Sequence, residues 1–161
     1  RVLFRSQVAN EPSLKGVPAA IRRRLPRHAR LALAAAREAV AMCKAQGLKI
    51  GLASASPLRM LEKVLTMFEL RDQFDALASA EHLPWSKPHP QVYLNCAAAL
   101  GVDPQRCVAL EDSVNGMIAS KAARMRSIVV PEAENSRDPR FALADVKLPS
   151  LLALTAENLL G

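Results

Sequence analysis

Short apolar runs alternate with amphipathic segments along most of the chain. The runs have the length and composition of buried strands and lie at residues 48–53, 74–78, 107–110 and 127–130. The segment after the first run has apolar residues at helical spacing, namely Leu58, Leu61, Val64, Leu65 and Phe68. This alternation predicts βαβ units. We therefore expect an α/β fold with a mainly parallel sheet and helices on both faces.

Punctuating residues indicate where several helices begin and end. An alanine- and leucine-rich helix is predicted over residues 30–46, with Gly47 as its stop. Ser56 is expected to cap the next helix, with Pro57 in its first position. The remaining predictions are helices over residues 90–100, 113–123 and 151–160 and a weaker strand at 144–146.

The N-terminal segment has a different pattern from the rest. Pro12, Pro18 and Pro26 interrupt any long helix, and five of the arginines lie within residues 22–30. Residues 1–37 carry nine Lys or Arg against one acid, a formal charge of +8, whereas the other 124 residues carry thirteen bases and fourteen acids. We expect residues 1–36 to be a basic leader, either disordered or not native sequence, and residues 37–161 to form the body.

Composition and charge exclude several classes of protein. Because the body is almost neutral, a nucleic-acid partner is not expected. The three cysteines and three histidines have no paired metal spacing, so no zinc site is expected. No apolar run is long enough to cross a bilayer, and no secretory signal is present. We therefore expect no membrane association and a cytoplasmic location.

Polar residues follow three of the predicted strands. Ser54 and Ala55 follow the first, Lys87 lies in the loop after the second, and Glu111 and Asp112 end the third. Since ligands of open α/β sheets bind at the carboxyl ends of the strands, these groups are expected at one edge. A hydroxyl, a helix N-terminus and an ammonium suit a phosphate, and adjacent carboxylates suit Mg²⁺.

Each of these features also has a plain structural explanation. Ser54 and Ser56 could serve only to cap a helix, and Lys87 could be an ordinary surface lysine held in a proline-containing turn. Asp112 or Ser113 could cap the helix that follows them. The residues taken singly leave these alternatives open.

Taken together, the segments Ser54-Ala55-Ser56, Lys87-Pro88 and Glu111-Asp112-Ser113 resemble the second, third and fourth motifs of the haloacid-dehalogenase superfamily. The resemblance covers roughly residues 37–161. It implies a Rossmann-like core and Mg²⁺-dependent hydrolysis of a small phosphorylated six-carbon sugar or polyol, in a protein expected to be monomeric. By position, Ser54, the Ala55 backbone and Lys87 would hold the transferring phosphoryl group. Asp112 would bind Mg²⁺, with Glu111 in support.

The chain departs from the superfamily pattern at its first motif. That motif, Asp-x-Asp-Gly, supplies the nucleophile and the acid–base group from an N-terminal strand, and a helical cap follows it. This sequence has no aspartate before Asp72. We therefore expect a core without its first strand and cap, and no phosphatase activity. Two alternatives stay open: a phosphotransferase resembling β-phosphoglucomutase, and a non-catalytic module whose basic arm binds nucleic acid.

Overall fold

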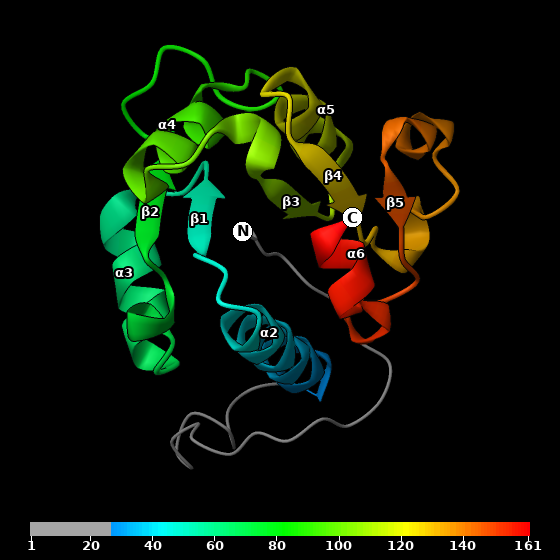
Figure 1. Cartoon of the computed structure of the whole chain (residues 1–161), viewed down its shortest axis with the longest axis horizontal. Helices are drawn as coiled ribbons and strands as arrows, with labels where there is room; N and C mark the ends of the chain where they lie inside the picture. Colours follow the sequence, from blue (N-terminus) through cyan, green and yellow to red (C-terminus); the bar gives the residue numbers. More distant parts are fainter. Residues whose placement is uncertain (1–26) are drawn as a thin grey trace.

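The computed structural model describes residues 27–161, with side chains described from Ala32 onward. Figure 1 shows a layered α/β arrangement. The helices are α2 (Arg27–Ala45), α3 (Leu58–Met67), α4 (Gln91–Leu100), α5 (Val114–Ala122) and α6 (Ala156–Leu160). The strands are β1 (Gly51–Ser54), β2 (Ala76–Ser79), β3 (Val108–Glu111), β4 (Arg126–Val129) and β5 (Val146–Lys147). No helix in residues 27–161 is long and apolar enough to cross a membrane.

The five described strands form two parallel sheets. One sheet has the order β1-β2, with Leu52 opposite Leu77, and the other has the order β3-β4-β5, with Leu110 opposite Ile128. Every strand pair is parallel, as the alternation of strands and helices predicted. Among the described strands β1 and β3 do not pair with each other. The described strands therefore fall into two separate groups, β1-β2 and β3-β4-β5.

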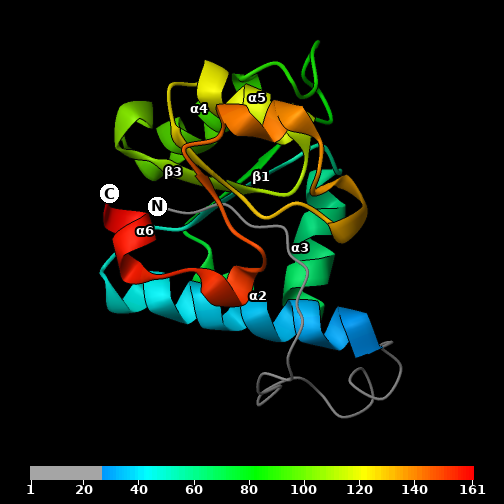
Figure 2. The same ribbon diagram turned by 90° about the vertical axis from the view of Figure 1, so that its right-hand side faces the viewer.

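Helices cover both faces of the sheets (Figure 2), with α4 and α5 on one side and α2 on the other. The pleat of β3 explains how one strand serves both layers, because successive side chains point to opposite faces. Val108 and Leu110 join the hydrophobic cluster that includes α2, whereas Ala109 joins the cluster that includes α4 and α5. A strand buried on both faces reads as a continuous apolar run, which is why it was visible in the sequence.

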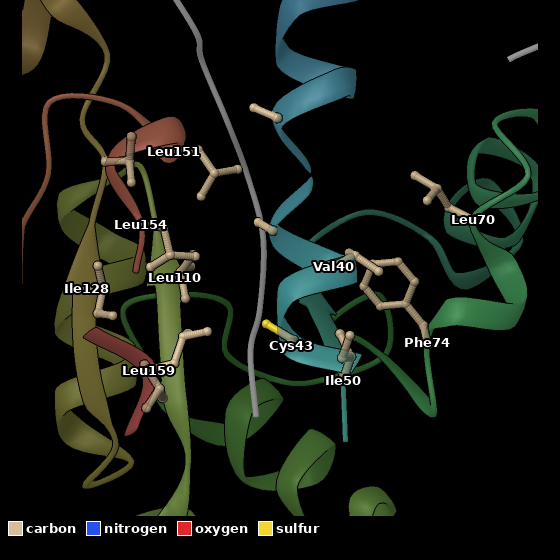
Figure 3. Packing of buried hydrophobic residues seen from close by; sticks show 14 of the residues in the cluster. Val40, Cys43, Ile50, Leu70, Phe74, Leu110, Ile128, Leu151, Leu154 and Leu159 are labelled. Atoms are coloured by element: carbon tan, nitrogen blue, oxygen red, sulfur yellow. The ribbon is translucent and has the colours of Figure 1, made fainter. Parts of the chain in front are cut away.

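Helix α2 is a structural part of the body. Ala35, Val40 and Cys43 of α2 are buried in a cluster that includes Leu110 from β3 and Leu159 from α6 (Figure 3). The helix begins at Arg27, so the boundary predicted between residues 36 and 37 falls inside it. Helix α2 packs against the body because its alanine-rich stripe supplies small apolar side chains for close packing. The rest of the predicted leader, residues 1–26, lies outside the described residues.

Among the predicted boundaries that differ from the structure are those of the first strand and the terminal helix. The first strand was predicted over residues 48–53, but β1 begins only at Gly51, and the N–H of Ile50 donates to the Asp75 carboxylate at 2.6 Å. The terminal helix predicted over residues 151–160 is divided. A short 3-10 turn at Leu151–Ala153 is followed by Thr155, which forms a capping box with Asn158 and starts α6.

Two aspartates fasten strand ends to helices in the same way. Asp75 accepts the Ile50 N–H ahead of β1 and pairs with Lys44 of α2 at 2.9 Å. Asp145 accepts the Ser127 N–H of β4 at 2.7 Å and pairs with Lys121 of α5 at 2.7 Å. Each carboxylate therefore satisfies a backbone donor at the start of a strand while holding a lysine of a covering helix.

We predict that Gly51→Ala destabilises the fold, because β1 lies close against α4. A Cβ at Gly51 would lie 2.5 Å from the Cys96 sulfur and 3.1 Å from Leu100 Cδ1. Overpacking of this kind costs about 1–3 kcal/mol. Urea denaturation followed by circular dichroism would measure the loss.

The control for this prediction is the double variant Gly51→Ala/Cys96→Ala, which removes the sulfur that the new methyl group would meet. In the Cys96→Ala background, Gly51→Ala should lower the free energy of unfolding by less than it does in the parent chain. Strictly additive effects would show that the Gly51–Cys96 contact does not limit packing here.

Candidate functional site

A cavity of about 530 Å³ opens at the carboxyl ends of β1 and β3. It has an apolar side formed by β1 and α3, which includes Leu52 and Leu61. Its polar side contains every residue singled out at this edge from the sequence: Ser54, Ala55, Lys87, Glu111 and Asp112. The structure therefore brings together groups that lie up to 58 positions apart in the chain.

The turn after β1 is held by side chains of its own and of the neighbouring strand. The Ser56 N–H donates to Ser54 Oγ at 3.1 Å, and Ser79 Oγ of β2 donates to the Ser56 carbonyl at 2.7 Å. The Ser54 oxygen accepts this bond, so its own hydroxyl hydrogen is still available to a ligand. The turn thus fixes Ser54 with its hydroxyl at the cavity.

The expected cap of α3 is wrong in detail. Pro57, not Ser56, is the N-cap residue, and no side chain caps it. Instead the Leu58 N–H donates to the carboxylate of Glu81 at 3.3 Å. A helix N-terminus attracts an anion, and here the described anion is Glu81 from the loop after β2. Sequence spacing could not reveal this partner because 23 positions separate the two residues.

Lys87 and Glu111 form an ion pair at the edge of the cavity. The Lys87 ammonium donates to Glu111 Oε1 at 2.5 Å, and the two side chains are only 16% and 8% exposed. Burial of two charges is tolerated when they pair and find further hydrogen bonds. Lys87 is therefore not the ordinary surface lysine that the turn alone allowed. The Lys87–Pro88 peptide bond in this loop is cis.

Tyr93 of α4 also belongs to this cluster, a role that the sequence patterns did not indicate. Its hydroxyl donates to Glu111 Oε1 and accepts from Lys87 Nζ, the latter at 3.1 Å. Burial, together with the negative charge of Glu111 and its hydrogen bond, raises the pKa of Tyr93 above its ordinary value, so the phenol stays protonated. A signal was available: a tyrosine on the apolar stripe of a helix needs a buried partner for its hydroxyl.

Glu111 also shapes the first turn of α5. Ser113 Oγ lies 3.3 Å from Glu111 Oε2 and accepts the Gly116 N–H at 3.1 Å, so Ser113 is the cap of this helix. Gly116 is required by space, since a Cβ there would lie 1.9 Å from Glu111 Oε2. The carboxylate is consequently enclosed by a helix turn, a phenol and an ammonium.

Asp112 is the remaining carboxylate of the cavity. Mg²⁺ in phosphate-processing sites takes one or two carboxylates, with waters and phosphate oxygens completing its shell. Asp112 offers a carboxylate of this kind, and Glu111, whose carboxylate accepts from Lys87 and Tyr93, is the other acidic residue of the cavity. Within residues 27–161 no group of three or more acidic, histidine or cysteine side chains could hold a metal. Asp112 could therefore contribute one carboxylate to a Mg²⁺ site at this cavity.

A second hollow of about 580 Å³ adjoins the first and shares Asp112 with it. The one described arginine that lines this hollow is Arg140. Its guanidinium donates to Asp138 at 2.6 Å. Hydrogen bonds from Arg140 lower the pKa of Asp138 to about 2. This ion pair neutralises the arginine, so the second hollow does not offer a bare cation to a phosphate.

Comparison with known proteins agrees with this fold. Residues 17–124 match the haloacid dehalogenase-like hydrolase family. The chain belongs to this family. It is 81% identical to hexitol phosphatase B of Escherichia coli K12 over 125 residues, which are 78% of the chain and 56% of that relative. It is 37% identical over 91 residues to β-phosphoglucomutase of Bacillus subtilis, covering 56% of the chain and 39% of the relative.

Solved structures show the same architecture. CbbY of Rhodobacter sphaeroides, solved in complex with xylulose-(1,5)bisphosphate, superposes with a TM-score of 0.69 at 34% identity, covering 76% of the chain and 56% of that structure. β-Phosphoglucomutase of Clostridium difficile gives a TM-score of 0.67 at 32% identity, over 76% of the chain and 52% of that structure. The chain spans little more than half the length of these two structures and of hexitol phosphatase B.

We predict that Gly116→Ala destabilises the protein although alanine favours helix. The methyl group would displace a carboxylate that three partners hold, at a cost of about 1–3 kcal/mol. Urea denaturation of Gly116→Ala, Glu111→Ala and the double variant would separate the terms. In the Glu111→Ala background the same substitution should be neutral or stabilising, by up to about 1 kcal/mol. An equal loss in both backgrounds would refute the proposed contact.

Proposed function

We propose that this chain is the core of a Mg²⁺-dependent phosphatase that acts on small phosphorylated sugars or polyols. The observation that carries the proposal is the meeting of Ser54, Lys87 and Asp112 at one cavity on the carboxyl edge of the strands. The 81% identity to a hexitol phosphatase supports the substrate class. The xylulose bisphosphate bound by the CbbY structure supports a sugar phosphate more generally.

Each of these residues has its own role in binding a phosphoryl group. In this proposal the Lys87 ammonium and the hydroxyl of Ser54 donate to its non-bridging oxygens, together with the N–H of Ala55. These donors stabilise the negative charge that the oxygens carry as the bond to the sugar oxygen breaks. Asp112 holds Mg²⁺, which offsets the same charge, and Glu111 supports the site by fixing Lys87.

The attacking group is the part that these residues do not supply. In the superfamily an aspartate of the Asp-x-Asp-Gly motif attacks phosphorus, and the second aspartate moves the proton. The 161 residues contain no such motif. The proposal therefore assigns phosphate and metal binding to this chain, and hydrolysis to a chain that also carries the two aspartates.

We predict that the purified 161-residue chain does not hydrolyse 2-deoxyglucose 6-phosphate in the presence of Mg²⁺. Release of inorganic phosphate should not exceed that of the Asp112→Asn variant purified in parallel. The comparison matters because a contaminating phosphatase would act equally in both samples. Turnover that Asp112→Asn abolishes would mean that another group of this chain is the nucleophile.

We also predict that a chimera becomes an active phosphatase when the N-terminal part of E. coli hexitol phosphatase B precedes residue 37. In it, Ser54→Ala and Lys87→Ala should each lower kcat/KM by about 100-fold, the scale for loss of one group that stabilises developing charge. Ser136→Ala, an exposed hydroxyl outside the cavity, serves as the control. Unchanged rates in Lys87→Ala would contradict the assignment.

A phosphotransferase related to β-phosphoglucomutase is the second candidate, favoured by the identity to that enzyme and the similarity to its structure. Product analysis of the chimera separates the two. A hydrolase releases inorganic phosphate and free sugar, whereas a phosphotransferase yields an isomeric sugar phosphate.

A further inference from the structure

Tyr93 lies where a tyrosine is chemically unusual. It is in the first turn of α4, is 0% exposed, and packs in the cluster formed by α4, α5 and the sheet. Phenylalanine would fill the same apolar space without a polar atom to satisfy. A buried hydroxyl without partners costs free energy, so its presence calls for partners that use it.

The partners of the Tyr93 hydroxyl are both charged residues of the candidate site. The hydroxyl accepts from Lys87 Nζ at 3.1 Å and donates to Glu111 Oε1. The hydroxyl therefore donates through its single proton and accepts through a lone pair. The ring contributes as well, since Lys87 Nζ lies 4.8 Å from its centroid, within the range of a cation–π interaction.

This arrangement controls the direction of the ammonium. A lysine ammonium has three N–H donors on a flexible stem. Two acceptors are recorded for Lys87 in the described part of the chain, Glu111 Oε1 and the Tyr93 hydroxyl. Both acceptors lie on the same side of the ammonium, because the Tyr93 hydroxyl itself donates to Glu111 Oε1, and together they restrain its position. Because Lys87 lines the cavity that also contains Ser54 and Asp112, its remaining donor capacity could serve a ligand there.

We propose that Tyr93 is a positioning residue of the phosphate site, whose hydroxyl holds the Lys87 ammonium in the orientation that a bound phosphoryl oxygen requires. The identity of the ligand rests on the proposed function, whereas the geometric role of Tyr93 does not. Tyr93 touches neither substrate nor reacting atoms. It acts through Lys87.

The test uses the 161-residue chain with ¹⁵N-labelled lysine, followed by NMR of the ammonium groups. An ammonium held by hydrogen bonds exchanges slowly enough to be observed, and its signal is assigned by its loss in Lys87→Arg. We expect a resolved Lys87 signal in the parent chain and a broadened or missing one in Tyr93→Phe. Titration with inorganic phosphate and Mg²⁺ should show binding about tenfold weaker in Tyr93→Phe, the scale of one lost hydrogen bond to a charged group.

The matched control is Ser120→Ala. Ser120 is also 0% exposed, and its hydroxyl bonds to Ser127 at 2.9 Å in the β4 and α5 layer. It does not line the cavity. Loss of this buried hydroxyl should lower stability on a similar scale while leaving the Lys87 signal and phosphate binding unchanged. A purely structural role for Tyr93 would make Tyr93→Phe behave like this control.

Further outcomes separate the inference from the proposed function. An unchanged Lys87 signal in Tyr93→Phe overturns the positioning role. A signal that depends on Tyr93, in a chain that binds no phosphate, supports positioning and counts against the proposed ligand. If Tyr93→Phe does not fold, the chain's single tyrosine offers a second measurement. Its ¹³Cζ resonance in the parent chain should shift in Lys87→Met, and no shift overturns the inference.

Discussion

One buried ion pair joins the two sheets at the candidate site. Lys87 follows β2 of the two-stranded sheet, and Glu111 ends β3 of the three-stranded sheet, yet their charged atoms are 2.5 Å apart. Removing one partner of such a pair leaves an uncompensated buried charge, at a cost of about 3–5 kcal/mol. Because β1 and β3 do not pair within the described strands, the Lys87–Glu111 pair also helps to connect the two sheets. The same two residues line the candidate site. Stability and ligand binding are therefore coupled here.

Helices supply the rest of that connection. The cluster around α2 combines Ile50 and Phe74 from the flanks of the first sheet with Leu110 and Ile128 from the second (Figure 3). On the opposite face, α4 packs on β1 and β2 and also contacts α5 (Figure 2). Packing of apolar side chains across a break needs no shared backbone hydrogen bonds. Apolar packing therefore connects the two groups into which the described strands fall.

Local patterns predicted most of the fold and the main members of the site. Buried parallel strands are continuous apolar runs, so the core of each strand was visible, and the rule that ligands bind at strand carboxyl ends brought Ser54, Lys87 and Asp112 together. The partners across the fold were not visible. Tyr93 reaches Glu111 over 18 positions and Glu81 reaches Leu58 over 23, and no spacing rule covers such distances. Ser56 misled for the same reason, since a hydroxyl on another strand, Ser79, organises its turn.

Asp75 and Asp145, each paired with a lysine, make the stability of the fold sensitive to acid. Burial alone would raise the pKa values of Asp75 and Asp145, but backbone and lysine hydrogen bonds outweigh it and hold both pKa values below the ordinary range. Groups with lowered values contribute fully above the ordinary aspartate pKa, and that contribution disappears as the pH falls through the lowered values. Since one carboxylate secures the approach to β1 and the other the start of β4, acid would loosen both halves of the core as the pH falls below the ordinary aspartate range.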